Sequence, residues 1–248
     1  MNALSVIIIA CNEEQHIHAC VHSAQQLEPL EILVIDSGST DATRTLAQAA
    51  GARVLDQPWL GYVAQRQFGD SQARGDWILA LDADEQITAA GAREILATVQ
   101  RADVHGAALT RRNWFLGSPL QCATEAIPRL ARRGHGHWAG ARVHERLQID
   151  GPIVTLKSPL EHAAWPDLAT YNRKHDLYAR LMAESRYAAG KRFRPWQLAS
   201  ALWSLPKFLL LKGGWREGSR ALVFACAHMI YSAKKSLYLF ELGWKARG

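Results

Sequence analysis

The first hundred residues alternate strand-like and helix-like patterns, and this alternation constrains the fold more than any other feature. Leu4–Ala10 (LSVIIIA) and Glu31–Asp36 (EILVID) are unbroken apolar runs rich in β-branched residues, which is typical of strands covered on both faces. Ser39 or Thr40 is suited to cap the helix that follows the second run. Such an alternation predicts right-handed βαβ units and a parallel sheet. The remaining helices and strands are predicted at residues 13–26, 40–50, 52–55, 62–73, 76–81 and 88–101.

The rhythm changes after about residue 102. Short strand-like pieces separated by Gly, Pro and His predict a mixed region built on the sheet edge. A helix over 167–189 follows, and a basic amphipathic helical region ends the chain. The fold class predicted is therefore α/β, with a mixed, mostly parallel sheet flanked by helices. The strand-like pieces are Val104–Arg112, Ile127–Arg133, Arg142–Gln148 and Ile153–Leu156.

Charge is unevenly distributed along the 248 residues. Residues 173–248 carry 15 Lys and Arg against 4 Asp and Glu, whereas the whole chain has a net charge of +6. Leu198–Leu211 and Ala221–Tyr231 are apolar, and Trp residues lie among the basic ones. This pattern favours contact with an anionic membrane surface, and ordinary core helices with a solvated basic face are the alternative. No recognised DNA- or RNA-binding motif is present, so nucleic acid is not an expected partner.

Polar side chains follow the predicted parallel strands, at the edge where such sheets bind ligands. Asp82 and Asp84 are two carboxylates, one residue apart, that suit Mg²⁺ or Mn²⁺, and a polar loop with helix-capping carboxylates is the alternative. Asp36 either accepts hydrogen bonds from a base or ribose or forms an Asx turn. The chain lacks GxGxxG, GxxxxGK[ST] and GxSxG, which disfavours dinucleotide, P-loop and α/β-hydrolase sites.

Three segments in this order, SVIIIACNEE, VIDSGSTDAT and GDWILALDADE, resemble inverting glycosyltransferase family 2, which has the GT-A fold, a Rossmann-like α/β architecture. Later motifs are similar to its subgroup of lipopolysaccharide core β-glucosyltransferases, so that the resemblance covers nearly the whole chain. The sequence departs from that subgroup at Gln67, where Asn is usual, and at Ala131, where an aromatic residue is usual. The later motifs are Gly61-Tyr62-x-x-Gln65-Arg66, Asn113-x-Phe115-x-Gly117, Pro128-Arg129-Leu130, Val143-His144-Glu145, Gly151-Pro152-Ile153 and Leu160-x-His162.

The resemblance implies a division of the chain and roles for single residues. Residues 1–101 would bind the nucleotide sugar, 102–170 the acceptor, and 171–248 would associate with a membrane. Asp84 would be the main ligand of Mg²⁺ or Mn²⁺, Asp82 would lie near ribose and metal, and Glu145 would be the general base. The residues implied to bind the uridine, the diphosphate or the acceptor are Ala10, Asn12, Glu13, Asp36, Arg66 and Arg129.

The implied reaction is transfer of a hexose, with glucose favoured, from a UDP-sugar to an inner-core sugar, with heptose favoured, on a lipid-linked saccharide. The enzyme would lie in the cytoplasm, peripherally on the inner membrane. The absence of a QxxRW motif favours addition of a single sugar over processive synthesis. Alternatives are the same fold acting on a polyprenyl phosphate, another glycan or a peptide, or a non-catalytic nucleotide-sugar-binding membrane protein.

Two details remain open from the residues alone. Glu145 is either the base or the partner of a strand-edge salt bridge with Arg142 or Arg146. Arg129, Arg132 and Arg133 either form a cluster that binds a phosphorylated acceptor or belong to a solvated loop.

Overall fold

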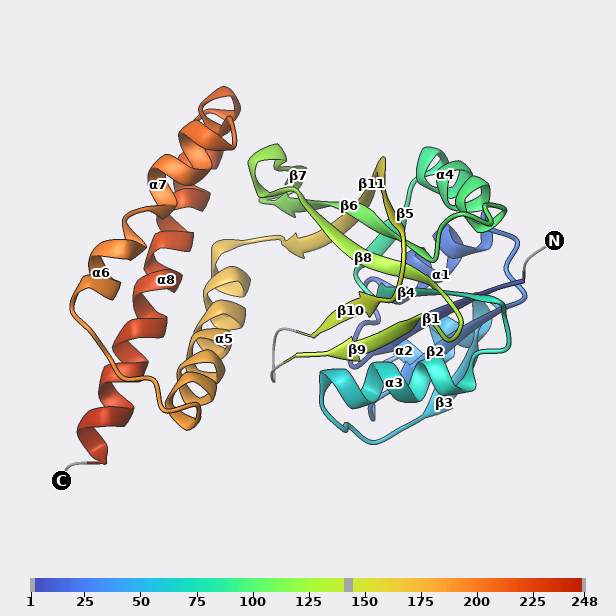
Figure 1. Cartoon of the computed structure of the whole chain (residues 1–248), viewed down its shortest axis with the longest axis horizontal. Helices are drawn as coiled ribbons and strands as arrows, with labels where there is room; N and C mark the ends of the chain where they lie inside the picture. Colours follow the sequence, from blue (N-terminus) through green and yellow to red (C-terminus); the bar gives the residue numbers. More distant parts are fainter. Residues whose placement is uncertain (1–2, 141–144, 247–248) are drawn as a thin grey trace. The chain divides into compact units, whose positions relative to one another are not determined.

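The computed structural model describes residues 3–140 and 145–246, and it divides into two compact units (Figure 1). The sheet unit comprises residues 3–111, 125–140 and 145–162. The helical unit comprises residues 112–124 and 163–246.

The sheet unit is built on a mixed sheet in the order β3-β2-β1-β4-β8-β6-β11-β5, with β7 paired to β6. The first four of these strands run parallel, as the buried apolar runs predict, and β8 then pairs antiparallel with β4. A separate hairpin consists of β9 and β10. The strands are β1 (Leu4–Ala10), β2 (Glu31–Asp36), β3 (Arg53–Asp56), β4 (Trp77–Asp82), β5 (Glu85–Ile87), β6 (Gly106–Phe115), β7 (Ser118–Pro119), β8 (Glu125–Arg132), β9 (Gly136–Ala139), β10 (Arg146–Ile149) and β11 (Ile153–Trp165).

Helices cover both faces of the parallel strands. The apolar sides of α1 (Ile17–Gln25), α2 (Thr43–Ala49) and α4 (Ala89–Val99) share one buried cluster with β1, β2 and β4. The other face packs against α3 (Tyr62–Gln72), which approaches closely because Gly69 faces β1. A Cβ added at Gly69 would lie 2.5 Å from a methyl group of the β1 strand, so no larger residue fits there without movement. The α/β class and the mixed sheet are therefore confirmed.

Some predicted boundaries were wrong. The helix expected to be capped by Ser39 or Thr40 begins only at Thr43, because both residues are used to join two loops, as described below. The strands β5 and β9 were not predicted, and β11 continues well beyond Leu156. The predicted strand over Arg142–Gln148 begins at Arg146 in the structure, and its first three residues lie outside the described ones.

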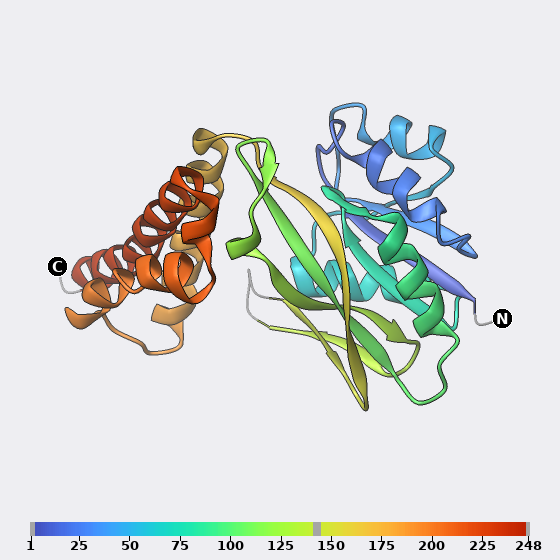
Figure 2. The ribbon, with the colours of Figure 1, turned by 90° about the horizontal axis from the view of Figure 1, so that it is seen from above.

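The helical unit pairs α5 (Leu168–Ala188) with the 27-residue α8 (Ser219–Lys245), which lie side by side in Figure 2. Asp176 on α5 accepts hydrogen bonds from Lys234 and Tyr238 on α8. An aromatic cluster that includes Phe115, Tyr171 and Phe224 forms the buried core of this unit. Shorter turns lie between the two helices, namely α6 (Trp196–Ala201), α7 (Ser204–Pro206), the π-helical Lys207–Leu211 and a 3₁₀ turn at Gly214–Glu217. Among the described residues, no helix combines the length and apolar character needed to cross a membrane.

Candidate functional site

The loops that follow β1 and β2 are bonded to each other at the carboxyl edge of the sheet. The Asn12 amide donates to Ser39 Oγ at 2.9 Å, and Asn12 Oδ1 accepts from the Thr40 amide at 2.9 Å. The Glu13 amide donates to Thr43 Oγ1 at 2.7 Å. Asn12 has a φ of 55°, a left-handed conformation in which Asn is enriched. These hydrogen bonds join the loop after β1, including the Ala10–Asn12 backbone, to the loop after β2. We call these two joined loops the ledge.

Asp36 is fully buried at the base of this ledge. Its Oδ1 accepts from the amides of Gly38 and Ser39 at 3.1 and 2.9 Å, and its Oδ2 accepts from Ser39 Oγ. This is the Asx turn that was the alternative interpretation of Asp36. Binding of uridine by Asp36 remains a prediction.

Asp82, at the end of β4, is held by two buried arginines. Arg66 of α3 donates to the Leu81 carbonyl at 2.8 Å and pairs with Asp82 Oδ1, and Arg129 of β8 pairs with Asp82 Oδ2. Burial alone would raise the pKa of Asp82, but the charges of Arg129 and Arg66 outweigh it and hold that pKa well below its usual range. The sequence-predicted Asp82, Arg66 and Arg129 thus come together, and Asp82 orients the two arginines.

Glu85 is a fully buried carboxylate that sequence reasoning missed as a site residue. Its Oε1 accepts from Arg129 at 3.0 Å and lies 3.4 Å from Arg111, and its Oε2 accepts from the Asp82 amide at 2.9 Å. Arg111 also pairs with Glu125, the residue opposite it on β8. A carboxylate this deeply buried requires such partners. The sequence feature that could have revealed Glu85 is its position directly after Asp82-x-Asp84. We call Arg66, Asp82, Glu85, Arg111 and Arg129 the buried charge cluster.

Asp84 lies beside His162, the second residue whose role the sequence did not reveal. Asp84 Oδ2 is 3.2 Å from His162 Nε2. The antiparallel pairing of β5 with β11 places His162 opposite Glu85 and so brings it next to Asp84. A carboxylate and an imidazole are suitable ligands for a divalent cation. Among residues 3–140 and 145–246, no group of three or more His, Cys, Asp and Glu side chains is arranged to hold a metal.

Glu145 lies directly before β10 and interacts electrostatically with Arg66, Asp82 and Arg129 of the buried charge cluster. Burial raises the pKa of Glu145 above its ordinary value, while the charges of Arg66 and Arg129 oppose that rise. The structure therefore brings the candidate base to the same edge of the sheet as Asp82. Of the two salt-bridge partners considered for Glu145, Arg146 is exposed on β10, and Arg142 lies outside the described residues.

Arg129, Arg132 and Arg133, for which the sequence left a phosphate-binding cluster and a solvated loop open, line one cavity but have separate hydrogen-bond partners. Arg129 binds the carboxylates described above, Arg132 donates to the Arg101 carbonyl at 3.0 Å, and Arg133 donates to the Gly75 carbonyl at 2.7 Å. Alternation along β8 sends Arg129 and Arg132 to opposite faces, and Arg133 lies beyond the end of that strand.

The geometry agrees with the similarity of the chain to known proteins. The model of the family "Glycosyl transferase family 2" matches residues 5–121. The lipopolysaccharide core biosynthesis glycosyltransferase LpsC of Rhizobium meliloti (strain 1021) is 31% identical over 254 residues, covering 96% of this chain and 92% of that protein. The chain belongs to glycosyltransferase family 2. An uncharacterized glycosyltransferase of Rickettsia typhi, RT0209, is 27% identical over 100% of this chain and 90% of its own length.

Among solved structures, this chain is similar to glucosyl-3-phosphoglycerate synthase from Mycobacterium tuberculosis in complex with Mg²⁺ and UDP. That similarity has 25% identity and a TM-score of 0.40, and it covers 45% of this chain and 44% of the other. The resemblance found in the sequence is confirmed by the relative from Rhizobium meliloti, and the observed sheet has the α/β architecture that the resemblance implies. Residues 5–121, the segment that the family model matches, contain the loops after β1 and β2, Arg66, Asp82 and Asp84. Arg129, Glu145 and His162 lie beyond that segment.

Proposed function

We propose that this family 2 glycosyltransferase moves a hexose, with glucose favoured, from a UDP-sugar to an inner-core sugar of lipopolysaccharide, with inversion. One observation carries the proposal. The Asp84–His162 pair, the arginines of the buried charge cluster and the half-buried Glu145 meet at the carboxyl edge of one sheet. The acceptor class is supported by the name of the relative from Rhizobium meliloti, which acts in lipopolysaccharide core biosynthesis.

The donor would bind across the ends of β1, β2 and β4. The ledge formed by Ala10–Asn12, Glu13 and Asp36 would hold the uridine, and Arg66 with Arg129 would face the diphosphate. Asp84 and His162 would hold Mg²⁺ or Mn²⁺. Two protein ligands suit a cation that takes its other ligands from phosphate oxygens and water. We assign Asp82 to orienting the arginines, because both of its oxygens already pair with them. A bound cation supplies stabilisation of the negative charge on the leaving diphosphate.

Glu145 would act on the acceptor. Its carboxylate takes the proton from the acceptor hydroxyl as that oxygen forms a bond to the anomeric carbon. The bond from that carbon to the diphosphate oxygen breaks, its electron pair leaves with UDP, and the configuration inverts. A carboxylate with a raised pKa is a stronger base than an exposed one, which suits this step.

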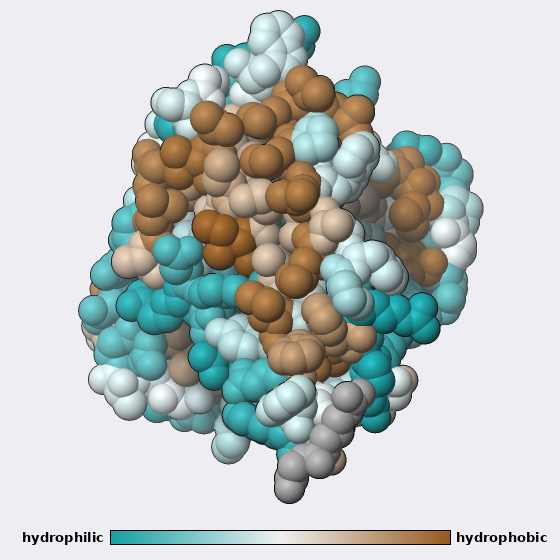
Figure 3. Space-filling model, turned by 90° about the vertical axis from the view of Figure 1, so that its left-hand side faces the viewer, coloured by the Kyte–Doolittle hydropathy of each residue, from teal (hydrophilic) through white to brown (hydrophobic). Residues whose placement is uncertain are grey.

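The helical unit would hold the enzyme at an anionic membrane surface, where a lipid-linked saccharide is presented. Val223, Ile230, Leu237 and Trp244 are exposed at intervals of seven residues, so they form one stripe along α8. Figure 3 shows apolar side chains as a broad area bordered by hydrophilic ones. Basic residues in such a border attract anionic headgroups. We place the enzyme on the cytoplasmic face of the inner membrane. Further exposed apolar residues of the same unit are Trp196, Leu202, Trp203, Leu210, Leu211 and Trp215.

The experiment that tests the proposal is transfer of labelled glucose from UDP-glucose to truncated lipopolysaccharide, by wild type and by Glu145→Gln. We expect wild type to transfer and Glu145→Gln to lose about 10²–10⁴ in rate, while its affinity for UDP stays unchanged. Asp150→Asn, which changes an exposed carboxylate in the same unit, is the matched control.

Polyprenyl phosphate, other glycans and peptides are tested as acceptors in parallel. Transfer to one of these and not to lipopolysaccharide would replace the acceptor and keep the enzyme class. Near-normal transfer by Glu145→Gln would remove Glu145 from the mechanism. UDP binding without transfer to any acceptor would favour the non-catalytic alternative.

A further inference from the structure

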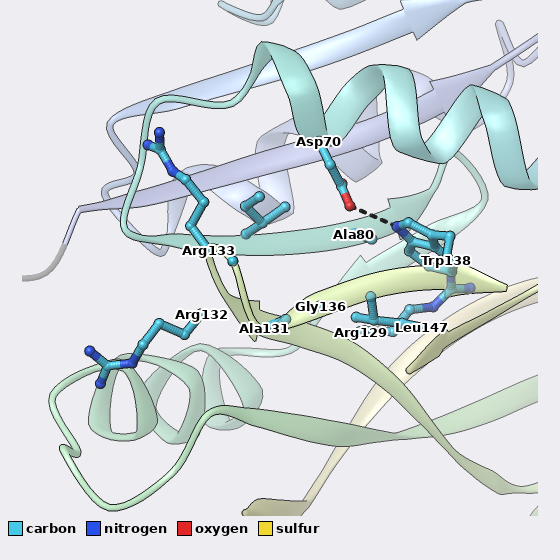
Figure 4. Close-up of a pocket in the computed structure, with 11 residues that line it drawn as sticks. Asp70, Ala80, Arg129, Ala131, Arg132, Arg133, Gly136, Trp138 and Leu147 are labelled. Carbon is cyan, nitrogen blue, oxygen red and sulfur yellow. Dashed lines mark hydrogen bonds between the residues drawn. The ribbon is translucent and has the colours of Figure 1, made fainter. Parts of the chain in front are cut away.

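Trp138 joins the β9–β10 hairpin to α3 at two points. Its Nε1 donates to Asp70 Oδ2 at 2.8 Å, which is the dashed line in Figure 4. Its carbonyl accepts from Gln67 Nε2 at 3.3 Å. Asp70 and Gln67 lie on α3, one turn apart, so both bonds fix the same part of the hairpin to the same helix.

The indole of Trp138 also contacts the donor side of the site. The guanidinium carbon of Arg66 is 5.2 Å from the ring centroid, a distance typical of cation–π attraction. Arg66 is fully buried and precedes Asp70 by four residues on α3. It pairs in turn with Asp82. The ring therefore limits where the guanidinium of Arg66 can lie.

The second strand of the hairpin begins at the residue after the candidate base. Trp138 pairs with Leu147, and Ala139 pairs with Arg146, which directly follows Glu145. The hairpin also sits tightly on β8, since a Cβ added at Gly136 would lie 2.8 Å from the Ala131 Cβ. A shift of Trp138 would consequently move the start of β10 and Glu145 with it.

A cavity of about 190 Å³ adjoins this contact. Figure 4 shows Asp70, Ala80, Trp138 and Leu147 among the residues around it. The indole packs against Ala80, Ala131 and Leu147 beside this cavity, and the bond to Asp70 adds a directional restraint that apolar packing does not supply. Oδ1 of Asp70 is buried and has no hydrogen-bond partner among the described residues.

We propose that Trp138, held by Asp70, is a positioning residue that fixes Glu145 relative to Arg66 during sugar transfer. The proposal rests on the function proposed above, because it assumes that Glu145 is the base and that Arg66 faces the diphosphate. The two contacts of the indole have different consequences. The bond to Asp70 determines the position of the base, and the face of the ring determines the position of the donor-side arginine.

Three variants separate these contacts in steady-state transfer assays. Trp138→Phe keeps a ring for Arg66 and removes the bond, so kcat falls about 10–100-fold while the KM for the UDP-sugar stays near that of wild type. Trp138→Leu removes both contacts, so kcat falls and the KM for the donor rises. Asp70→Asn keeps an acceptor for the indole N–H, so its kcat stays within about threefold of wild type, whereas that of Asp70→Ala falls as far as that of Trp138→Phe.

Hydrogen exchange of β9 and β10 amides is the second readout, and it does not require transfer. Trp138→Phe and Asp70→Ala should accelerate exchange in β10, and Asp70→Asn should not. Wild-type kcat together with unchanged exchange in Trp138→Phe would overturn the proposal, as would loss of activity in Asp70→Asn equal to that in Asp70→Ala. If wild type neither binds UDP nor transfers sugar while exchange responds as expected, the proposed function fails and the structural link between Trp138 and the hairpin stands.

Discussion

The sheet unit places charged side chains in its interior, whereas the helical unit places apolar side chains on its surface. In the sheet unit Arg66 and Glu85 are fully buried, and they pair with the partly buried Asp82 and the buried Arg129, respectively. In the helical unit Leu211 and Trp244 are 72% and 66% exposed. Each arrangement is unfavourable for folding alone, because buried ions lose their hydration and exposed apolar groups contact water. The difference supports the proposal that the sheet unit carries out the transfer and that the helical unit contacts a membrane surface.

The largest expected effect comes from breaking the buried charge cluster. Arg129→Met leaves Asp82 and Glu85 with one guanidinium partner fewer, and we expect the free energy of unfolding to fall by about 3–5 kcal/mol. Denaturant titration measures this loss. Arg101→Met, which removes an exposed arginine paired with Asp103, is the control and should leave the midpoint unchanged. Equal midpoints for the two variants would show that the cluster does not stabilise the fold.

Asp70 provides a smaller effect, which depends on pH. Burial raises the pKa of Asp70 to about 6, while its bond from Trp138 and the charge of Arg66 oppose the rise. The folded state therefore holds this proton at pH values where the unfolded state has released it, so stability falls as the pH rises from about 4 to above 6. Through this group alone the loss is about 3 kcal/mol.

Asp70→Asn removes that dependence. We expect this variant to match wild type near pH 4 and to be the more stable protein at pH 8, measured by denaturant titration at both values. A constant difference between the two proteins across this range would show that Asp70 titrates normally.

The smallest effect per residue is expected on the surface of the helical unit. Ile230→Asp and Leu237→Asp change exposed positions on α8, so the fold should persist and binding to vesicles should weaken. Cosedimentation with vesicles of anionic and of zwitterionic lipid measures this, and wild type should prefer the anionic ones. Each basic residue near the surface contributes about 1 kcal/mol, so added salt should weaken binding too. Leu30→Asp, an exposed change in the sheet unit, is the control. Equal binding by all variants would contradict a role for the α8 stripe.

The parallel half of the sheet was predictable because its strands are buried on both faces. The runs at Leu4–Ala10 and Glu31–Asp36 have few alternatives to central strands, and the structure has them with the same bounds. The Asp82-x-Asp84 pair was found at a strand end for the same reason. Local patterns of three to seven residues were enough for these elements.

Contacts between distant segments were not predictable. His162 lies next to Asp84 only because β11 pairs with β5, and Glu85 is buried only because two strands bring Arg111 and Arg129 to it. The strand β9 has only four residues in a Gly-rich stretch that indicated a loop, although it carries Trp138. In each case long-range strand pairing determines the environment, and that information is absent from the local sequence.

Calorimetric titration of the protein with UDP, in Mn²⁺ and then in EDTA, tests whether Asp84 and His162 form a cation-assisted nucleotide site. We expect binding that requires the cation and that is lost in both Asp84→Ala and His162→Ala, while Asp150→Asn binds as wild type does. Folded wild-type protein that fails to bind UDP in either condition, or that binds equally in both, would contradict a cation-assisted UDP-sugar site at Asp84 and His162.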